Sequence, residues 1–222
     1  MIREIALDDG VMSLLSSHAL RSLRAQLPVA GYQLPEETQA TGNRQPATLL
    51  LLRLSRAGGA DMNEMRRFTA ADAEEFSRLG QETFAAIERL PFLTVAAIDG
   101  DCFGGALDLA LAFDLRYATP RSRFSHPGAK LGIVTGFGGT TRWRKAMTPA
   151  AARRLFLANE VLSAADAHAI GLVDGIGEAD LARLEALDPG AVRVLKELSR
   201  HADRLSQREM MLCAQLLGEL YF

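Results

Sequence analysis

Apolar residues in this 222-residue chain are arranged in two patterns. Short continuous apolar runs, ATLLLLRLS at 47–55 and TVAAI at 94–98, are typical of parallel strands that are buried on both faces. After Thr69, by contrast, apolar residues recur every three or four positions, which predicts a helix over 70–89 that Pro91 ends. Two buried strands joined by a helix indicate an α/β fold.

The same patterns predict the remaining elements. The polar stretch 28–46 is long for a connection, and we expect a mobile loop or lid there. We expect 99–105 to form a turn, 113–118 and 172–176 to be strands, and helices at 19–27, 61–65, 106–112, 139–147, 148–157, 163–170, 181–187, 190–199 and 202–220. Because everything after residue 179 is helical, we divide the chain into an α/β core over 1–175 and a helical C-terminal region over 176–222.

Composition and charge exclude several classes of protein. The formal net charge of −2 gives no field that would recruit nucleic acid or an anionic membrane, and we interpret the basic run 142–145 as a solvated helix face. No apolar run is long enough to cross a bilayer, and the acidic N-terminal residues are unlike a signal peptide. The two cysteines lie far apart and no histidines cluster, so we predict no metal site and a cytoplasmic protein with reduced thiols.

Two glycine-containing turns follow the buried strands. They span Ala57–Asp61 and Gly104–Asp108, and we expect Asp61 to cap the helical turn after it. In an open α/β sheet, ligands bind at the carboxyl ends of the strands, where one backbone N–H from each turn could hold an oxyanion. The simpler alternative is that small residues merely fit where a strand meets a helix.

The residues in and around these turns resemble the enoyl-CoA hydratase/isomerase (crotonase) superfamily. The similarity is carried by TVAAIDGDCFGGALDLALAFDLRYATPRSRFSHPGAKLGIVTGFGGTTRW at 94–143, by RAGGADMNEM at 56–65 and by LSAADAHAIGLVD at 162–174. It implies a spiral of ββα units with a helical C-terminal trimerisation region, and a homotrimer or dimer of trimers. It also implies an acyl-CoA thioester as ligand, with coenzyme A as part of the substrate and no other cofactor.

The resemblance assigns roles to particular residues. The backbone N–H groups of Ala60 and Gly105 would hold the thioester oxygen and stabilise an enolate. The adenine of coenzyme A would lie against the backbone of Arg56, Ala57 and Gly58.

The sequence departs from the family where hydratases carry two glutamates. Asp108 occupies the first position, and Gly128 replaces the second, where we expect a void that a bulkier acyl group or a water could fill. Asp108 is the candidate acid/base, although an acid near a helix N-terminus also serves simply to complement the dipole. His126 is a second candidate, because it could point toward the place of the missing glutamate; alternatively it packs at a subunit surface or bonds backbone.

These observations predict an acyl-CoA-processing enzyme with one acid/base carboxylate, which would act as an isomerase, a decarboxylase or an atypical hydratase. The alternative is a non-catalytic acyl-CoA-binding protein or scaffold that kept the fold and lost the second glutamate. Both hypotheses require the two glycine-containing turns, so the turns do not distinguish them.

Overall fold

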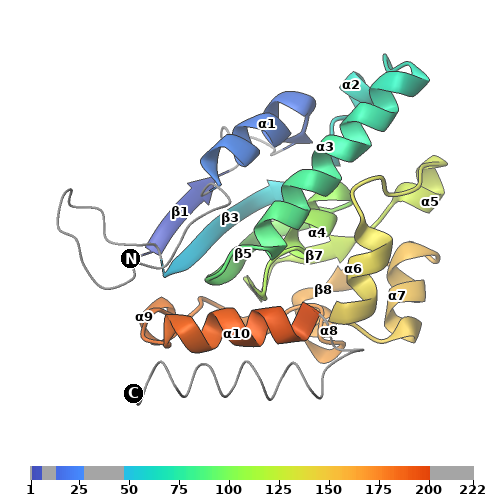
Figure 1. The fold of residues 1–222 in the computed structure, drawn as a ribbon. Coiled ribbons are helices and arrows are strands. Elements are labelled where there is room, and N and C mark those ends of the chain that lie inside the picture. Colours follow the sequence, from blue (N-terminus) through green and yellow to red (C-terminus); the bar gives the residue numbers. More distant parts are fainter. Residues whose placement is uncertain (1, 7–13, 28–47, 201–222) are drawn as a thin grey trace.

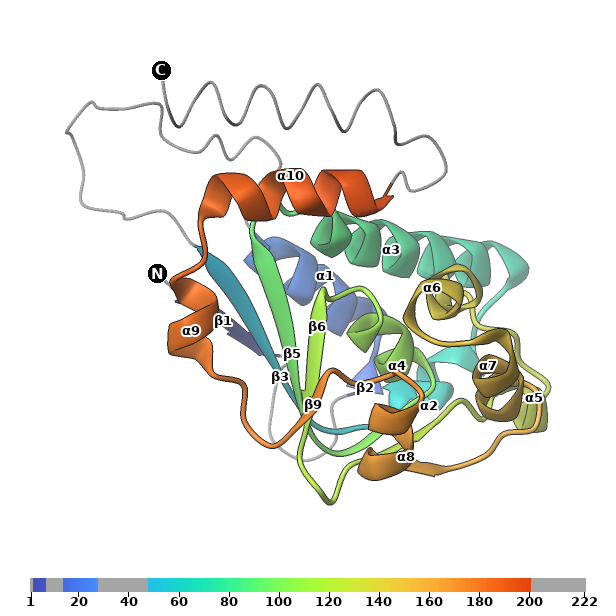
Figure 2. The ribbon, with the colours of Figure 1, turned by 90° about the horizontal axis from the view of Figure 1, so that it is seen from below.

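A parallel β-sheet with helices on both faces forms the centre of the molecule (Figures 1 and 2). The computed structural model describes residues 2–6, 14–27 and 48–200. The main path of the sheet has the strand order β1-β3-β5-β6-β9, with bounds Ile2–Ala6, Leu49–Ala57, Leu93–Phe103, Leu115–Ala118 and Gly175–Ile176. Beyond this path, β7 (Arg123–Ser125) pairs with β5 and, in antiparallel sense, with β8 (Leu162–Ser163). The predicted α/β class with a parallel sheet is confirmed.

The leucine run of β3 shows why the sheet is covered on both faces. Alternate side chains of a strand point to opposite faces. Leu50, Leu52 and Leu54 therefore pack into the larger hydrophobic core, which includes residues of α1 (Ser17–Gln26), α3 (Ala70–Glu88) and α4 (Gly105–Ala110). Leu49 and Leu51 point the other way, toward Val95 and Leu184 of α9 (Leu181–Glu185).

Polar caps set the start of several helices where the sequence predicts them. Ser16 caps α1, and Thr148 caps α7 (Pro149–Phe156). Thr69 and Ser163 each form a reciprocal capping box, the first at α3 and the second at α8 (Ala164–Ala169). Each cap stabilises its helix by about 1 kcal/mol.

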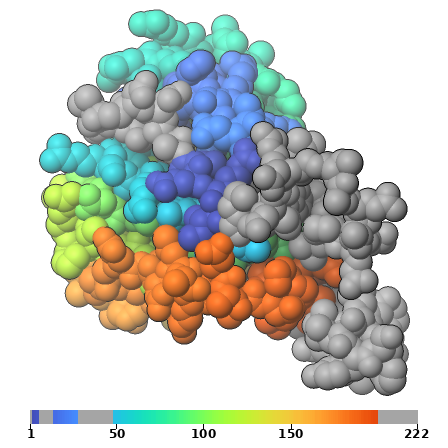
Figure 3. Space-filling model, turned by 90° about the vertical axis from the view of Figure 1, so that its left-hand side faces the viewer, coloured from blue at the N-terminus to red at the C-terminus, as the bar shows by residue number. Residues whose placement is uncertain are grey.

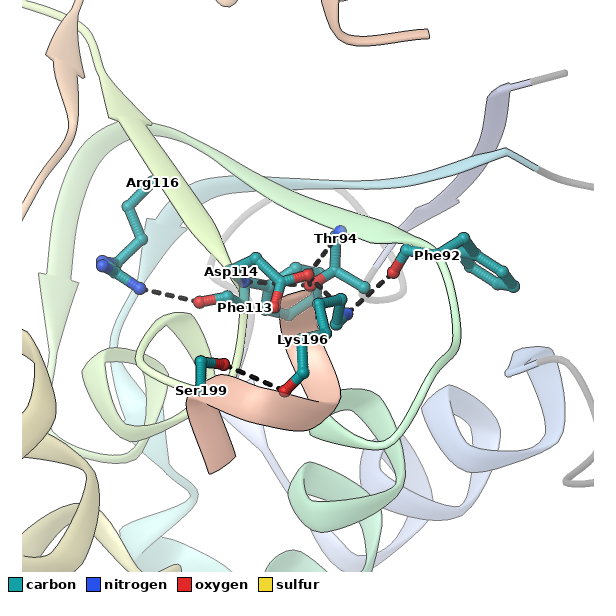
Figure 4. A network of polar contacts seen from close by, with 7 residues as sticks. All are labelled: Phe92, Thr94, Phe113, Asp114, Arg116, Lys196 and Ser199. Atoms are coloured by element: carbon teal, nitrogen blue, oxygen red, sulfur yellow. Dashed lines mark hydrogen bonds and ion pairs between the residues drawn. The ribbon is translucent and has the colours of Figure 1, made fainter. Parts of the chain in front are cut away.

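Helix α10 (Pro189–Arg200) is fastened to the sheet by one buried lysine (Figure 4). Lys196 Nζ donates to the Phe92 carbonyl oxygen at 2.7 Å and pairs with Asp114. Asp114 also accepts from the N–H and the hydroxyl of Thr94, both at 2.8 Å. Because Thr94 and Asp114 lie where β5 and β6 begin, α10 lies near the amino ends of these strands. Figure 3 shows this C-terminal segment, in orange, running below the blue N-terminal segment.

Strand β5 corrects one prediction. It continues as far as Phe103, so most of the predicted turn over 99–105 is strand. Asp99 and Asp101 form ion pairs with Arg121, in the turn before β7, and with Arg123, the first residue of β7. The chain reverses only at Gly104, whose φ of 54° suits glycine.

The basic run at 142–145 holds a second correction. It lies on α6 (Gly139–Ala146), and Arg142 is buried there rather than solvated. Its guanidinium donates to the Phe137 carbonyl oxygen and to Glu88, each at 2.7 Å. A charged residue in a basic run can therefore be buried when a carboxylate and a carbonyl oxygen accept its hydrogen bonds.

Several short elements lie outside the periodic patterns. These are β2 (Leu14–Leu15), β4 (Gly59–Ala60) and α5 (Gly128–Leu131), while α2 (Met62–Met65) matches the predicted turn. The predicted lid at 28–46 and the helix at 202–220 lie outside the described residues. The division near residue 175 stays a prediction. None of the helices described here combines the length and apolar character that a membrane crossing requires.

Candidate active site

A cavity of about 280 Å³ opens at the carboxyl ends of β3 and β5. Its polar lining includes Asp108, His126 and Thr135, and its small residues include Ala60 and Gly105. The rest of the lining is mainly apolar: Met62, Met65, Phe68, Phe76, Leu131, Ile133, Val134 and Phe137. The structure therefore brings the predicted N–H donors and both predicted acid/base side chains to one cavity.

The backbone nitrogen of Ala60 lies close to Gly105. Asp61 N–H donates to the Leu15 carbonyl oxygen at 3.2 Å in the β2–β4 pair. N–H groups point alternately to the two edges of an extended strand, so the N–H of Ala60 points away from β2. A Cβ placed on Gly105 would lie 3.3 Å from the Ala60 nitrogen, which puts these two residues side by side.

The Gly105 N–H is available because of its place in a helix. Gly105 is the first residue of α4, and the first N–H groups of a helix have no acceptor within it. The hydrogen bonds of α4 begin two residues later, where the N–H groups of Leu107 and Asp108 donate to the Gly104 carbonyl oxygen. Ala60 and Gly105 thus form a geometry suited to holding a carbonyl oxygen as charge develops on it.

Asp108 is one turn into α4 and is only 1% exposed. Its Oδ2 accepts a short hydrogen bond from the Thr135 hydroxyl. Its Oδ1 has no hydrogen-bond partner among the described residues and lies against Gly139, where a Cβ would be only 1.9 Å away. A carboxylate buried this deeply with a spare oxygen is costly, which favours a role beyond complementing the helix dipole.

His126 is buried beside Asp108. The imidazole is 5% exposed, and its Nε2 lies 3.5 Å from Asp108 Oδ2, with no hydrogen-bond partner in the described part of the chain. The ring stacks on Phe156 of α7, with centroids 4.6 Å apart and planes at 26°. Of the two expectations for His126, the structure favours the one that points it into the site.

Gly128 lines the cavity, as the predicted void requires, but the direction in which a side chain would leave it is occupied. A Cβ at Gly128 would lie 2.7 Å from the Ile133 carbonyl oxygen and 3.2 Å from His126 Cε1 and Nδ1. The backbone is not extended here, because β7 ends at Ser125 and Gly128 opens α5. Even so, the imidazole of His126 lies beside position 128, and both residues line the cavity.

The residues predicted to contact coenzyme A lie at the end of β3. The pairing of β3 with β5 is irregular between Ser55 and Ala57, and Arg56 takes a left-handed φ of 51° with its side chain exposed. Ala57 is fully buried, and Gly58 lines the cavity. Arg56 therefore lies two residues before the cavity lining, in a backbone conformation that non-glycine residues seldom adopt.

Other candidates have structural roles. Asp61 accepts from the N–H groups of Asn63 and Glu64 and caps α2, as predicted. Burial raises the pKa of the Cys102 thiol, and the negative charge of Asp108 raises it further, so this cysteine is not a thiolate nucleophile. No group of side chains among the described residues has the makings of a metal site.

Four site residues are missing from the sequence predictions. Thr135 and Gly139 contact the Asp108 carboxylate, Phe156 supports the His126 ring, and Phe137 lies between Gly80 and Gly105. For Thr135 the sequence carries one signal: in the resembling family's GIIPGFGG motif a proline stands where this chain has threonine. Phe156 carries no such signal, because a phenylalanine on an amphipathic helix indicates only that the residue packs in the hydrophobic core.

The chain belongs to the enoyl-CoA hydratase/isomerase family. The family's sequence model matches residues 56–211, more than two thirds of the chain. The match includes both glycine-containing turns, Asp108 and His126, so the predicted family membership is confirmed.

Individual relatives are similar over part of their length. The crotonyl-CoA hydratase of Syntrophomonas wolfei is 37% identical over 139 residues, covering 60% of this chain and 54% of the relative. The mitochondrial methylglutaconyl-CoA hydratase 1 of Pyricularia oryzae is 38% identical over 120 residues, covering 54% of this chain and 34% of the relative. The chain thus matches about half, or less, of these curated relatives. The chain is also similar to the solved structure of an enoyl-CoA hydratase/carnithine racemase from Magnetospirillum magneticum. The superposition has a TM-score of 0.82 and 24% identity, and it covers 97% of this chain and 84% of the Magnetospirillum chain. That likeness confirms the crotonase-like fold.

Proposed function

We propose that this chain processes an acyl-CoA thioester through an enolate, with Asp108 and His126 as its acid/base pair. The observation that carries the proposal is the meeting of both side chains at the cavity lined by Ala60 and Gly105. The thioester oxygen accepts from the two N–H groups, which stabilise it as negative charge develops there. The apolar remainder of the cavity fits the hydrocarbon part of an acyl group.

Addition of water to an enoyl-CoA is the first reaction to test. In that reaction the oxygen of water bonds to the β-carbon, one proton of the water goes to a base, and a proton is delivered to the α-carbon. Two groups that exchange protons serve this reaction better than one. The sequence alone offered a single carboxylate, and the His126 imidazole beside Asp108 supplies the second group. Two relatives named as hydratases support the same choice.

Coenzyme A would bind across the end of β3. The exposed Arg56 side chain could contact its phosphates, while the backbone at Ala57 and Gly58 leads to the cavity. The proposed trimer, or dimer of trimers, rests on the family resemblance of the helical C-terminal region. Sedimentation or light scattering measures it directly.

The test compares turnover of enoyl-, 3-hydroxyacyl- and malonyl-type CoA esters by matched variants. Asp108→Asn and His126→Asn are expected to lower kcat by about 100-fold or more. Asp101→Asn, at an exposed ion pair, and His18→Asn, at an exposed helical site, keep wild-type rates. Coenzyme A is expected to raise the melting temperature of all five proteins.

Two outcomes contradict the proposal in different ways. If no ester is turned over while coenzyme A still raises the melting temperature, the chain is the non-catalytic acyl-CoA binder. If activity survives Asp108→Asn but not His126→Asn, the imidazole alone moves the proton, and the acid/base role proposed for Asp108 is wrong.

A further inference from the structure

The hydroxyl of Thr135 contacts the Asp108 carboxylate. We infer that Thr135 is a positioning residue that fixes Asp108 in a single orientation for proton transfer, an inference that rests on the proposed function. The hydroxyl of Thr135 donates to Asp108 Oδ2, the same oxygen that His126 Nε2 approaches at 3.5 Å. A hydrogen bond to a carboxylate in a buried site is stronger than one between neutral groups.

Gly139 confines the carboxylate from the other side. Oδ1 lies where a side chain at Gly139 would begin, so the carboxylate occupies a slot between the first residue of α6 and the Thr135 hydroxyl. Because Gly139 has no side chain, it leaves room for the carboxylate but donates no side-chain hydrogen bond to it. Thr135 is therefore the one side chain, among the described residues, that donates a hydrogen bond to this carboxylate.

The loop that carries Thr135 is itself fixed. Gln81 Nε2 of α3 donates to the Gly136 carbonyl oxygen at 2.6 Å, and Arg142 donates to the Phe137 carbonyl oxygen at 2.7 Å. Before Thr135, the Ile133 N–H donates to the Gly128 carbonyl oxygen at 2.9 Å. Anchors on both sides of Thr135 define where its hydroxyl lies, which is what a positioning residue requires.

The Phe137 ring adds an apolar anchor to the same loop. A Cβ on Gly80 would lie 2.1 Å from Phe137 Cδ1, and a Cβ on Gly105 would lie 2.9 Å from Cε2. The ring thus fits between α3 and the first residue of α4, next to the proposed Gly105 donor. The loop is therefore held against the two elements that carry the cavity wall and Asp108.

Matched valine and serine variants test the inference. Thr135→Val keeps the shape of the side chain and removes the hydroxyl, so kcat on the best ester is expected to fall about 10- to 100-fold, with KM within about threefold of wild type. Thr135→Ser restores the donor, and kcat is expected to return to within about threefold. Thr141→Val is the control, because the Thr141 hydroxyl donates to the Gly138 carbonyl oxygen at 2.8 Å on the exposed surface of the same segment.

A second measurement does not depend on turnover. In urea unfolding followed by circular dichroism, Thr135→Val is expected to lower the midpoint in wild type but not in Asp108→Ala, because the two side chains interact. If this coupling is present but wild type turns over no ester, the proposed function fails while the Thr135–Asp108 contact stands.

Three results overturn the inference while leaving the proposed function intact. One is a Thr135→Val enzyme with the kcat of Thr141→Val. Another is a loss of kcat that Thr135→Ser does not restore, which would indicate a packing role. The third is an equal midpoint loss in wild type and in Asp108→Ala, which would mean that the two side chains do not interact.

Discussion

Gly139→Ala perturbs the slot that holds the Asp108 carboxylate. The new Cβ would lie 1.9 Å from Asp108 Oδ1 and 2.7 Å from Cγ, whereas real Cβ atoms essentially never approach a heavy atom closer than 3.0 Å. The carboxylate oxygen therefore has to move by about 1.1 Å, from 1.9 Å to at least 3.0 Å. The backbone at the first turn of α6 does not absorb the change readily, because Arg142 and the Phe137 carbonyl oxygen fasten it.

Both activity and stability should change by amounts that follow from this displacement. A misplacement of about 1 Å costs about 100-fold in rate, so kcat/KM is expected to fall by about two orders of magnitude. Overpacking of this kind lowers the free energy of unfolding by about 1–3 kcal/mol. Steady-state assays on the best ester and urea unfolding by circular dichroism measure the two quantities.

Two further variants separate the contact from a general effect of alanine. Gly132→Ala also lies near the site, with a φ of 70° and no heavy atom within 4 Å of the new Cβ. It should lose about 1–2 kcal/mol through backbone strain while keeping its rate. Adding Asp108→Ala to Gly139→Ala removes the collision and should recover most of the lost stability. A Gly139→Ala enzyme with wild-type rate and midpoint refutes the placement of Asp108 described above.

Three smaller predictions concern other parts of the fold. Lys196→Met leaves the Phe92 carbonyl oxygen and Asp114 without their shared donor and should lower the free energy of unfolding by about 1–3 kcal/mol in urea titrations; an unchanged midpoint contradicts the bridge described for α10. The Arg121 guanidinium, and after it the Thr119 hydroxyl, lower the pKa of Asp99 below its ordinary value of 3.8. Its contribution is therefore present above that value and is lost as the pH falls through the lowered pKa, so Asp99→Asn should lower Tm by about 1–3 °C at pH 7 and by less as the pH falls below about 3.8. Because burial raises the thiol pKa of Cys102, peptide mapping after alkylation at about pH 8 should find Cys102 labelled only in unfolded protein.

Much of the fold is predictable because periodicity and caps are local signals. The leucine run of β3 and the capping boxes at Thr69 and Ser163 locate their elements within a few residues. The extension of β5 to Phe103 depends instead on backbone pairing of residues 101–103 with β7, which lies about twenty residues later in the sequence. No local pattern contains that information.

The site divides in a similar way. The N–H donors and Asp108 follow from motifs, since the turns fix where a backbone N–H or a helical side chain lies. The position of His126 does not, because it depends on where β7 ends and on the Phe156 ring against which the imidazole stacks. Thr135 and Gly139 are informative only once the Asp108 carboxylate has a location in space.

The close fit at Gly128 constrains how this chain could have diverged from relatives that carry a glutamate there. Any side chain at position 128 meets the Ile133 carbonyl oxygen and the His126 imidazole at once. A substitution at 128 alone therefore requires the Ile133 carbonyl oxygen to move and the His126 ring to shift by a few tenths of an ångström. We therefore expect substitutions at 126 and 128 to be coupled, and to depend on the loop that carries Ile133. Searches that require a glutamate at 128 would consequently discard chains in which a histidine two residues earlier lies beside that position.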